Sequence, residues 1–357
     1  MAVKSESTKI SAVDEELKKL LEARKAEIKV IGIGGAGNNT VSRMMQVGIV
    51  GAEVVALNTD AQDLLYTDAD TKVLIGKELT RGLGAGANPH IGMESARESK
   101  NDIKEALQGA DMVFITCGLG GGTGTGGAPV VADVAKKMGA LAVGIVTLPF
   151  TMEGKQRMDN ARHGLEDLEK VVDTLIVIPN DKLLEIVPDV SIITAFKVSD
   201  EILVNAVKGI AELVTKPGLV NLDFADIKAV MGDGGIAMIG MGESDTENRS
   251  LEAVEKAINN PLLDVEIDGA EGALINVSGG SDITIRECQS IVEAVSSKLH
   301  QDAKIIWGAQ IIKELGDVVR TMLIITGVKS SQIYGPTKTF TKEKEKEIEK
   351  ILGIDFV

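Results

Sequence analysis

The amino-acid sequence predicts a doubly wound α/β domain with a mainly parallel sheet, joined by a long central helix to a smaller α+β domain. Short apolar runs rich in Val and Ile alternate with helix-length stretches from residue 28 to residue 190. A segment with helical periodicity, residues 191–218, follows them, and strand and helix patterns resume over residues 219–328. The length of 357 residues also exceeds one ordinary domain of roughly 100–200 residues, so two domains are expected.

The apolar runs of the first domain, residues 28–190, lack polar alternation, which is typical of strands buried on both faces of a parallel sheet. They are Ile28–Ile33, Glu53–Leu57, Lys72–Ile75, Asp111–Thr116, Ala140–Val146 and Thr174–Pro179. In such a sheet the ligand lies beyond the carboxyl ends of the strands. The loops that follow these runs are therefore the candidate binding loops.

The central helix, Ser191–Thr215, carries apolar residues on more than one face, so we expect it to pack between the two domains. Pro217-Gly218 is expected to end the helical segment. In the second domain we expect Thr284 and Glu287 to form a capping box for one of its helices. Its expected strands are Gly235–Met241, Ala273–Val277, Lys304–Gly308 and Val319–Val328, and its expected helices lie near Arg249–Asn259 and Ile285–Leu299.

The two ends of the chain have different patterns from the domains. Residues 1–27 are expected to form an extension with an amphipathic helix over Asp14–Glu27. Residues 329–357 form a C-terminal tail, with a polar linker, a Lys/Glu-rich helix and a short apolar end. That apolar end has two interpretations, a docking segment for a membrane adaptor or a frayed terminus.

The composition of the chain argues against several classes of function. The net charge is −15, from 53 acidic and 38 basic residues, and no basic stripe reverses it, so binding to nucleic acid or directly to an anionic membrane is not expected. Cys117, Cys288 and the three histidines show no metal-ligand spacing, so no protein-ligated metal is expected. The start of the chain lacks an apolar signal core and no run of about 18 apolar residues occurs, which favours the cytoplasm.

The first glycine motif directly follows the first expected strand. Gly32, Gly34 and Gly37 satisfy the G-x-G-x-x-G fingerprint of dinucleotide-binding folds. The motif alone also fits a tight strand-to-helix turn without a ligand. Against NAD, the second strand ends in Asn58-Thr59-Asp60 rather than in a single well-placed acidic residue, and later loops are glycine-rich as well.

The second glycine motif, Cys117–Gly127, follows the fourth expected strand and precedes a helix expected to begin near Ala128-Pro129. Its glycines allow successive backbone N–H groups to point inward, which makes a nest for an anion at a helix N-terminus. No lysine follows the glycines as a Walker loop requires. We therefore expect a di- or triphosphate that is neutralised by backbone dipoles and a metal ion.

Four loops resemble those of the tubulin/FtsZ family, in the same order along the chain. They are most similar to the loops of its archaeal members. The four loops are Asn58–Gln62, Gly82–Pro89, Gly120–Gly126 and Asn221–Asp226, and the resemblance covers about Ile28 to Val328. It implies a tubulin/FtsZ-like fold, binding of GTP and GDP with Mg²⁺, and hydrolysis of GTP. It further implies a cell-division protein that polymerises head-to-tail with itself into a cytokinetic ring at the division site, and a membrane-anchoring adaptor that could bind the tail.

The resemblance also assigns residues to the nucleotide. It places Ala85, Gly86 and Ala87 near the γ-phosphate, and Glu153 and Arg157 at the ribose. Asn180 and Asp200 would read the guanine edge, with Phe196 against its face. The phosphate-binding set, with Asp60 in the same site, is Gly34, Gly35, Ala36, Gly37, Asn38, Asn39, Gly121, Gly122, Thr123, Gly124, Thr125 and Gly126.

The last loop carries the catalytic assignment of the resemblance. Asn221, Asp223 and Asp226 match the family's synergy loop, which acts on the nucleotide of the neighbouring subunit. From spacing alone, Asp223 and Asp226 fit a helix-capping arrangement better than a catalytic one, and only the resemblance reverses that preference. A continuous central helix spans on the order of 35 Å at 1.5 Å per residue, which would carry this loop away from its own phosphates.

Two other function classes remain open from the sequence. A Rossmann oxidoreductase would bind NAD(H) and show no nucleotide-dependent assembly. A structural relative would bind GTP without hydrolysing it, although the Asp223/Asp226 pair argues against that interpretation.

Overall fold

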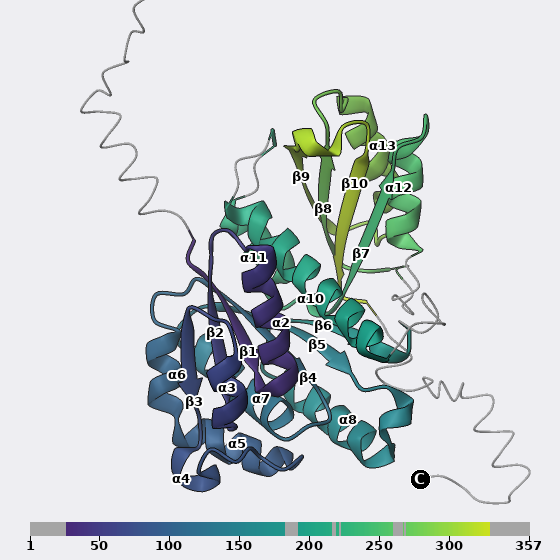
Figure 1. The fold of residues 1–357 in the computed structure, drawn as a ribbon. Coiled ribbons are helices and arrows are strands. Elements are labelled where there is room, and N and C mark those ends of the chain that lie inside the picture. The colour runs from purple at the N-terminus through teal and green to yellow at the C-terminus, as the bar shows by residue number, and fades with distance from the viewer. Residues whose placement is uncertain are drawn as a thin grey trace, which may run out of the picture.

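The computed structural model describes residues 26–182, 192–215, 219–220, 223–259, 267 and 269–328. Figure 1 shows two sheet-containing halves with the long helix α10 (Ile192–Thr215) running diagonally between them. The fold is the predicted one, a mostly parallel α/β half joined to an α+β half.

The first half is built on six parallel strands in the order β3-β2-β1-β4-β5-β6. Each predicted run overlaps one strand. The strands are β1 (Ile28–Ile33), β2 (Ala52–Asn58), β3 (Thr71–Leu74), β4 (Met112–Gly118), β5 (Leu141–Leu148) and β6 (Thr174–Pro179).

Helices cover both faces of this sheet, because neighbouring strand residues point to opposite faces. Val30 packs in the core beneath α2 and α10, whereas Ile31 packs in the core beneath α5, α6, α7 and α8. The helices of this half are α2 (Gly34–Val47), α3 (Ala61–Tyr66), α4 (Lys77–Thr80), α5 (Pro89–Glu98), α6 (Lys100–Ala106), α7 (Thr123–Lys137), η1 (Thr151–Glu153) and α8 (Lys155–Glu169).

The second half continues the same sheet. β7 pairs with β6 in parallel over Thr174↔Gly235 to Ile176↔Ala237, so the described strands form one sheet with the order β6-β7-β10-β8-β9 at this end. This continuity between the two domains was not predicted. The elements are α11 (Phe224–Met231), β7 (Gly235–Ser244), α12 (Arg249–Ile258), β8 (Gly272–Gly279), α13 (Ile285–Ser296), β9 (Lys304–Ile311), η2 (Lys313–Leu315) and β10 (Val319–Thr326).

The expected position of α10 between the halves is confirmed by its core contacts. Leu203, Val207 and Ile210 are buried in one cluster together with residues of β5 in the first half and of β8 and β10 in the second. Gly209 faces Met322 of β10 so closely that a Cβ there would lie 2.3 Å from its sulfur. At 24 residues α10 is roughly 36 Å long, and it runs from the Asp200–Thr40 contact to the Thr215–Val50 contact.

Two local expectations were wrong. α7 begins at Thr123 rather than near Ala128-Pro129, because the end of the glycine tract is itself helical, and Pro129 lies inside the helix. Glu27 is not helical. Its carbonyl accepts hydrogen bonds from the backbone N–H groups of Asp111 and Met112, which extends the β1–β4 edge. The predicted capping box of Thr284 and Glu287 is confirmed at α13.

Several predictions lie outside the described residues: the N-terminal helix as far as residue 25, Pro217-Gly218, Asn221 and the tail from residue 329. Among the helices that the structure does describe, none combines the length and the apolar character that crossing a bilayer requires.

Candidate nucleotide-binding and hydrolysis site

The loops that follow β1, β2 and β4 meet at the carboxyl edge of the sheet. Gly34, at the start of α2, has a φ of +71°, and a Cβ there would lie 3.0 Å from the backbone nitrogen of Gly124. The hydroxyls of Thr59 and Thr123 are hydrogen-bonded at 2.6 Å. The structure therefore brings the two predicted phosphate loops, residues 34–39 and 121–126, into contact.

Both helices that start in these loops begin without a side-chain cap. Neither Ile33 before α2 nor Gly122 before α7 supplies a capping hydrogen bond, so first-turn N–H groups of both helices have no such partner. Beside them, a Cβ on Gly121 would meet no atom within 4 Å, which marks open space. Two uncapped helix N-termini around open space suit an anionic group.

The predicted γ-phosphate loop, Ala85 to Ala87, lies against the glycine tract. A Cβ on Gly122 would lie 2.7 Å from the Cβ of Ala85, so only glycine fits there. Asn160 of α8 donates from Nδ2 to the carbonyls of Ala87 at 3.3 Å and Gly120 at 3.5 Å, and so connects the two loops. Sequence reasoning did not find Asn160, and no motif marks it.

The side chains of Asp60 and Asn38 make hydrogen bonds beside these loops. The Asp60 carboxylate accepts from the backbone N–H groups of Gln62 and Asp63 and caps α3. Asn38 is buried and donates from Nδ2 to Asp63 at 3.2 Å, while its Oδ1 has no hydrogen-bond partner among the described residues. Asn39, in contrast, is exposed.

The predicted base- and ribose-binding residues share one pocket between β5, β6 and α10. Glu153 and Arg157 form an ion pair at 2.9 Å, and the rings of Phe196 and Phe150 meet edge-to-face at 5.3 Å. The pocket is lined by Ala36, Thr40, Gly118, Leu119, Thr147, Pro149, Glu153, Arg157, Asn180, Phe196, Ser199, Asp200 and Leu203.

Two buried hydroxyls contact the predicted base readers. Thr40 donates to Asp200 Oδ1 at 2.9 Å, and Ser199 donates to Asn180 Oδ1 at 3.0 Å. Burial raises the pKa of the Asp200 carboxyl above its ordinary value, and the Thr40 hydrogen bond and the charge of Arg43 oppose that rise. Neither hydroxyl was predicted, because a Ser or Thr inside a helical pattern carries no signal of its partner.

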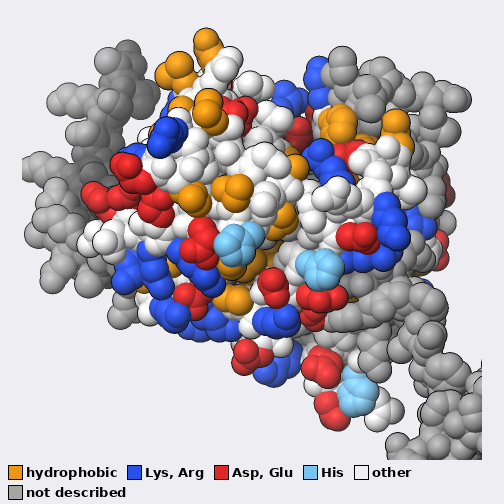
Figure 2. All heavy atoms as spheres, turned by 90° about the horizontal axis from the view of Figure 1, so that it is seen from below, with side chains coloured by type: hydrophobic (Ala, Val, Ile, Leu, Met, Phe, Trp, Pro, Cys, Tyr) orange, Lys and Arg blue, Asp and Glu red, His pale blue; other side chains and the backbone are white. Residues whose placement is uncertain are grey.

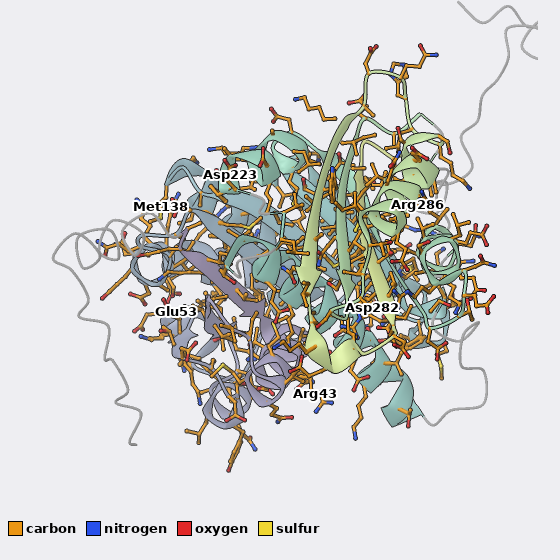
Figure 3. All side chains as sticks on the ribbon, turned by 90° about the horizontal axis from the view of Figure 1, so that it is seen from above. Arg43, Glu53, Met138, Asp223, Asp282 and Arg286 are labelled. Atoms are coloured by element: carbon orange, nitrogen blue, oxygen red, sulfur yellow. The ribbon has the colours of Figure 1, made fainter. Side chains whose placement is uncertain are left out.

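The predicted catalytic loop lies at the opposite, amino edge of the sheet. The hydroxyl of Thr215, the last residue of α10, is 3.4 Å from the carbonyl of Val50, just before β2 begins, and the end of α11 contacts Thr174, the first residue of β6. Figure 3 shows Asp223 at the start of α11, well away from Arg43 on α2. The structure does not bring Asp223 and Asp226 to the phosphate loops of their own chain.

The capping interpretation of this loop is realised in the structure. Asp226 N–H donates to Asp223 Oδ1 at 2.8 Å, and Asp223 N–H donates to Asp226 Oδ2 at 3.2 Å. Asp223 is exposed and Asp226 half-buried, so capping leaves carboxylate oxygens accessible. Exposed Leu219 and Val220 precede them.

The face seen in Figure 2 carries a groove between α5, α7 and α8 that includes His90 and His163. Acidic and basic side chains are interspersed over this face, with apolar side chains between them. Within the described part of the chain, no three His, Cys, Asp or Glu side chains are placed to hold a metal ion.

Comparisons with known proteins match both halves. The model of the GTPase domain of the tubulin/FtsZ family matches residues 27–188, and that of the FtsZ family C-terminal domain matches residues 235–329. The cell division protein FtsZ 1 of Thermococcus kodakarensis is 66% identical over 320 residues, covering 90% of this chain and 86% of that protein. The protein of the same name from Methanocaldococcus jannaschii is 60% identical over 339 residues, covering 95% and 93%.

Solved structures agree with these matches. An empty FtsZ dimer from M. jannaschii superposes with a TM-score of 0.84 at 62% identity, covering 89% of this chain and 92% of that one. A GDP-bound monomer of CetZ1 from Haloferax volcanii gives a TM-score of 0.75 at 26% identity, covering 92% and 100%. The family that the four loops predicted is confirmed: this chain belongs to the tubulin/FtsZ family of GTPases and carries both the GTPase domain and the FtsZ C-terminal domain.

Proposed function

We propose that this protein is a cell-division GTPase that assembles head-to-tail, and that the loop 221–226 of one subunit completes the hydrolysis site of the next. One observation carries the proposal. α10 separates the base pocket at the carboxyl edge from the Asp223/Asp226 loop at the amino edge of the same sheet. A neighbour stacked in the same orientation would bring the two together.

The nucleotide fits the carboxyl edge in one orientation. The phosphates lie against residues 34–39 and 121–126 at the starts of α2 and α7, with Ala85, Gly86 and Ala87 near the γ-phosphate. Arg157 and Glu153 contact the ribose, and Phe196 packs on the base. The Asp200 carboxylate accepts hydrogen bonds from N1–H and the 2-amino group of guanine, a pattern that adenine does not offer. Asp60 fixes the loop beside the phosphates through its cap of α3.

Magnesium fits the same corner. Mg²⁺ prefers oxygen ligands and keeps several waters. The buried Asn38 Oδ1, which has no hydrogen-bond partner among the described residues, and the neighbouring Asp63 carboxylate offer such oxygens. The phosphate loops 34–39 and 121–126 contain no Lys or Arg. When bound, the ion supplies neutralisation of the phosphate charge.

The assembly contact follows from exposed apolar side chains at both edges. At the carboxyl edge Leu83 and Met152 are 84% and 72% exposed, and at the amino edge Leu219 is 64% exposed. Different surfaces that face each other in a head-to-tail contact propagate as a filament rather than close into a dimer. The empty M. jannaschii dimer among the related structures is consistent with such self-association.

In the completed site, Asp223, Asp226 and Asn221 orient a water against the γ-phosphorus. The water oxygen forms the new bond as the bond from the γ-phosphorus to the bridging oxygen breaks. GDP and phosphate leave, and a carboxylate takes up the proton and returns it to solvent. Loss of the γ-phosphate removes a contact of the 85–87 loop at the subunit boundary, which links hydrolysis to disassembly.

The cellular role that we propose is a cytoplasmic ring at the division site. The tail 329–357 lies outside the described residues, and its apolar end is proposed as the binding segment for a membrane adaptor. The net charge of −15 opposes binding to nucleic acid.

The proposal is tested by placing a charge in the amino-edge contact. Leu219→Lys should bind GTP like the parent chain, yet fail to pellet with GTP and lose nearly all turnover. The matched control is Leu251→Lys, at another exposed apolar position, on α12, which should assemble normally. GTP should also displace bound nucleotide far better than ATP. Full turnover by the Leu219 variant, or equal competition by ATP, would contradict the proposal.

A further inference from the structure

Among the described residues, Ser199 holds the side chain of Asn180 in the base pocket by a hydrogen bond. Asn180 follows β6, and Ser199 lies one residue before Asp200 on α10. The Ser199 hydroxyl donates to Asn180 Oδ1 at 3.0 Å, and each of the two residues is only 5% exposed. Both line the pocket.

The direction of this hydrogen bond fixes what Asn180 offers to a ligand. A side-chain amide has an accepting oxygen at one end and a donating NH₂ at the other. With the oxygen engaged by Ser199, the NH₂ is the free end, and no described residue accepts a hydrogen bond from it. Asn180 therefore presents a donor to the pocket.

We propose that Ser199 is a positioning residue that sets the direction of the Asn180 amide, and that the pocket thereby selects a purine with a carbonyl rather than an amino group at position 6. The inference rests on the proposed GTP function and adds a residue to it. Guanine O6 accepts from Asn180 Nδ2. A 6-amino group would place donor against donor, and a buried donor without an acceptor is unfavourable.

The second reader, Asp200, depends on a different hydroxyl. Thr40 on α2 donates to Asp200 Oδ1, whereas Ser199 contacts Asn180. Position 6 of the purine and its N1/2-amino edge are thus read by separate pairs. Selectivity at the two edges is therefore separable by mutation.

The experiment measures equilibrium affinity for three triphosphates. They are GTP, the 2,6-diaminopurine riboside analogue, which carries a 6-amino group and has no proton on N1, and inosine triphosphate, which lacks only the 2-amino group. Without the hydroxyl the amide can turn and accept from a 6-amino group. In Ser199→Ala the preference for GTP over the diaminopurine analogue should fall about tenfold, the change expected from one neutral hydrogen bond. Part of that fall should be an absolute gain in affinity for the analogue.

Control variants distinguish a loss of the Asn180 amide orientation from a general loosening of the pocket. Ser199→Thr keeps the hydroxyl and should keep the preference of the parent chain. In Ser199→Ala the preference for GTP over inosine triphosphate should not change, whereas Thr40→Val should reduce that preference.

Three outcomes would overturn the proposal: equal loss of affinity for all three nucleotides in Ser199→Ala, an unchanged preference at position 6, or a Thr variant that behaves like the Ala variant. Absence of GTP binding by the parent chain would instead refute the proposed function, so the two failures are distinguishable.

Discussion

The carboxyl edge of the first half and the loops at the end of the second half are both rich in glycine, but their polar groups are satisfied differently. In the second half, a Cβ on Gly280 would lie 1.9 Å from the Gly316 carbonyl, and Arg249 bonds to Glu287, Asp282 and the Asp317 carbonyl. At the carboxyl edge, Gly121 faces open space and Asn38 Oδ1 has no partner among the described residues. Gly280 thus allows close packing in the second half, whereas Gly121 leaves room for a ligand at the carboxyl edge.

Two capping boxes of the second half, at α11 and α13, differ in their proposed roles. At α11, Asp223 and Asp226 exchange backbone hydrogen bonds, and at α13, Thr284 and Glu287 do the same. The local geometry is equivalent, so geometry within one subunit does not distinguish a catalytic pair from a structural one. Only the α11 pair is proposed to face a neighbour's nucleotide.

The largest expected effect comes from removing the two N-caps. Asp223→Ala should lower GTP turnover by at least about 100-fold, the range expected for losing a group that transfers a proton or orients the attacking water. Thr284→Ala should leave turnover close to normal and cost about 1 kcal/mol of stability, the usual value of a cap. Phosphate release and thermal unfolding measure the two effects. Similar turnover in both variants would show that the α11 pair is only a cap.

The next largest effect concerns stability of the second half. The Arg249 side chain is 13% exposed and pairs with two carboxylates, so Arg249→Met should reduce the free energy of unfolding by about 3 kcal/mol. Arg320→Met removes a more exposed pair with Glu243 and should cost less than about 1 kcal/mol. Urea unfolding measures the free energy of unfolding of both variants. Neither change should alter GTP affinity, and a large loss of affinity in the Arg249 variant would mean that the halves are not functionally separate.

The smallest expected effect is a pH dependence of opposite sign in the two regions. Burial opposes ionisation of Glu287, but the Arg249 and Thr284 hydrogen bonds prevail and hold its pKa below the ordinary value. Its contribution to stability is therefore present above the unfolded-state pKa and is lost as pH falls through the folded-state pKa. Burial raises the pKa of Asp200, so the ionised carboxylate lowers the stability of the fold at higher pH. This loss of stability disappears as the carboxylate is protonated at lower pH.

Replacing each of these two carboxylates with its amide tests the predicted sign of its effect on stability. Asp200→Asn should raise the melting temperature of the nucleotide-free protein at neutral pH by about 1–2 °C, and Glu287→Gln should lower it by a similar amount. Both changes in melting temperature should become smaller at acidic pH. A loss of melting temperature in the Asp200 variant at neutral pH would contradict the assigned sign.

The strands and the phosphate loops could be predicted because their signals are local. Buried parallel strands are continuous Val/Ile runs, and Gly120–Gly126 follows β4 and runs into the first turn of α7. The start of α7 was placed too late because glycine has low helix propensity, whereas in the fold Gly126 must be glycine, since a Cβ would lie 1.9 Å from the Pro89 carbonyl. Tertiary packing decides that boundary.

Other features depend on contacts between distant segments. The β6–β7 pairing joins Thr174 to Gly235 across α10, and no local pattern encodes it. The bonds of Ser199 to Asn180 and of Asn160 to Ala87 join residues on different elements in the same way. The proposed shared hydrolysis site goes one step further, since its two parts would lie in different subunits.

The most direct test of that shared site uses two variants that each block one end of the contact. Leu219→Lys blocks the amino edge and Leu83→Lys blocks the carboxyl edge, so neither should assemble or hydrolyse GTP alone. Mixed, they retain one intact contact and should form a heterodimer with one complete site, which restores turnover without filaments. Adding Asp226→Ala to the Leu83 variant, which supplies the loop, should abolish that turnover, whereas adding it to the Leu219 variant should not. Restored turnover that is indifferent to which subunit carries Asp226→Ala would contradict the account.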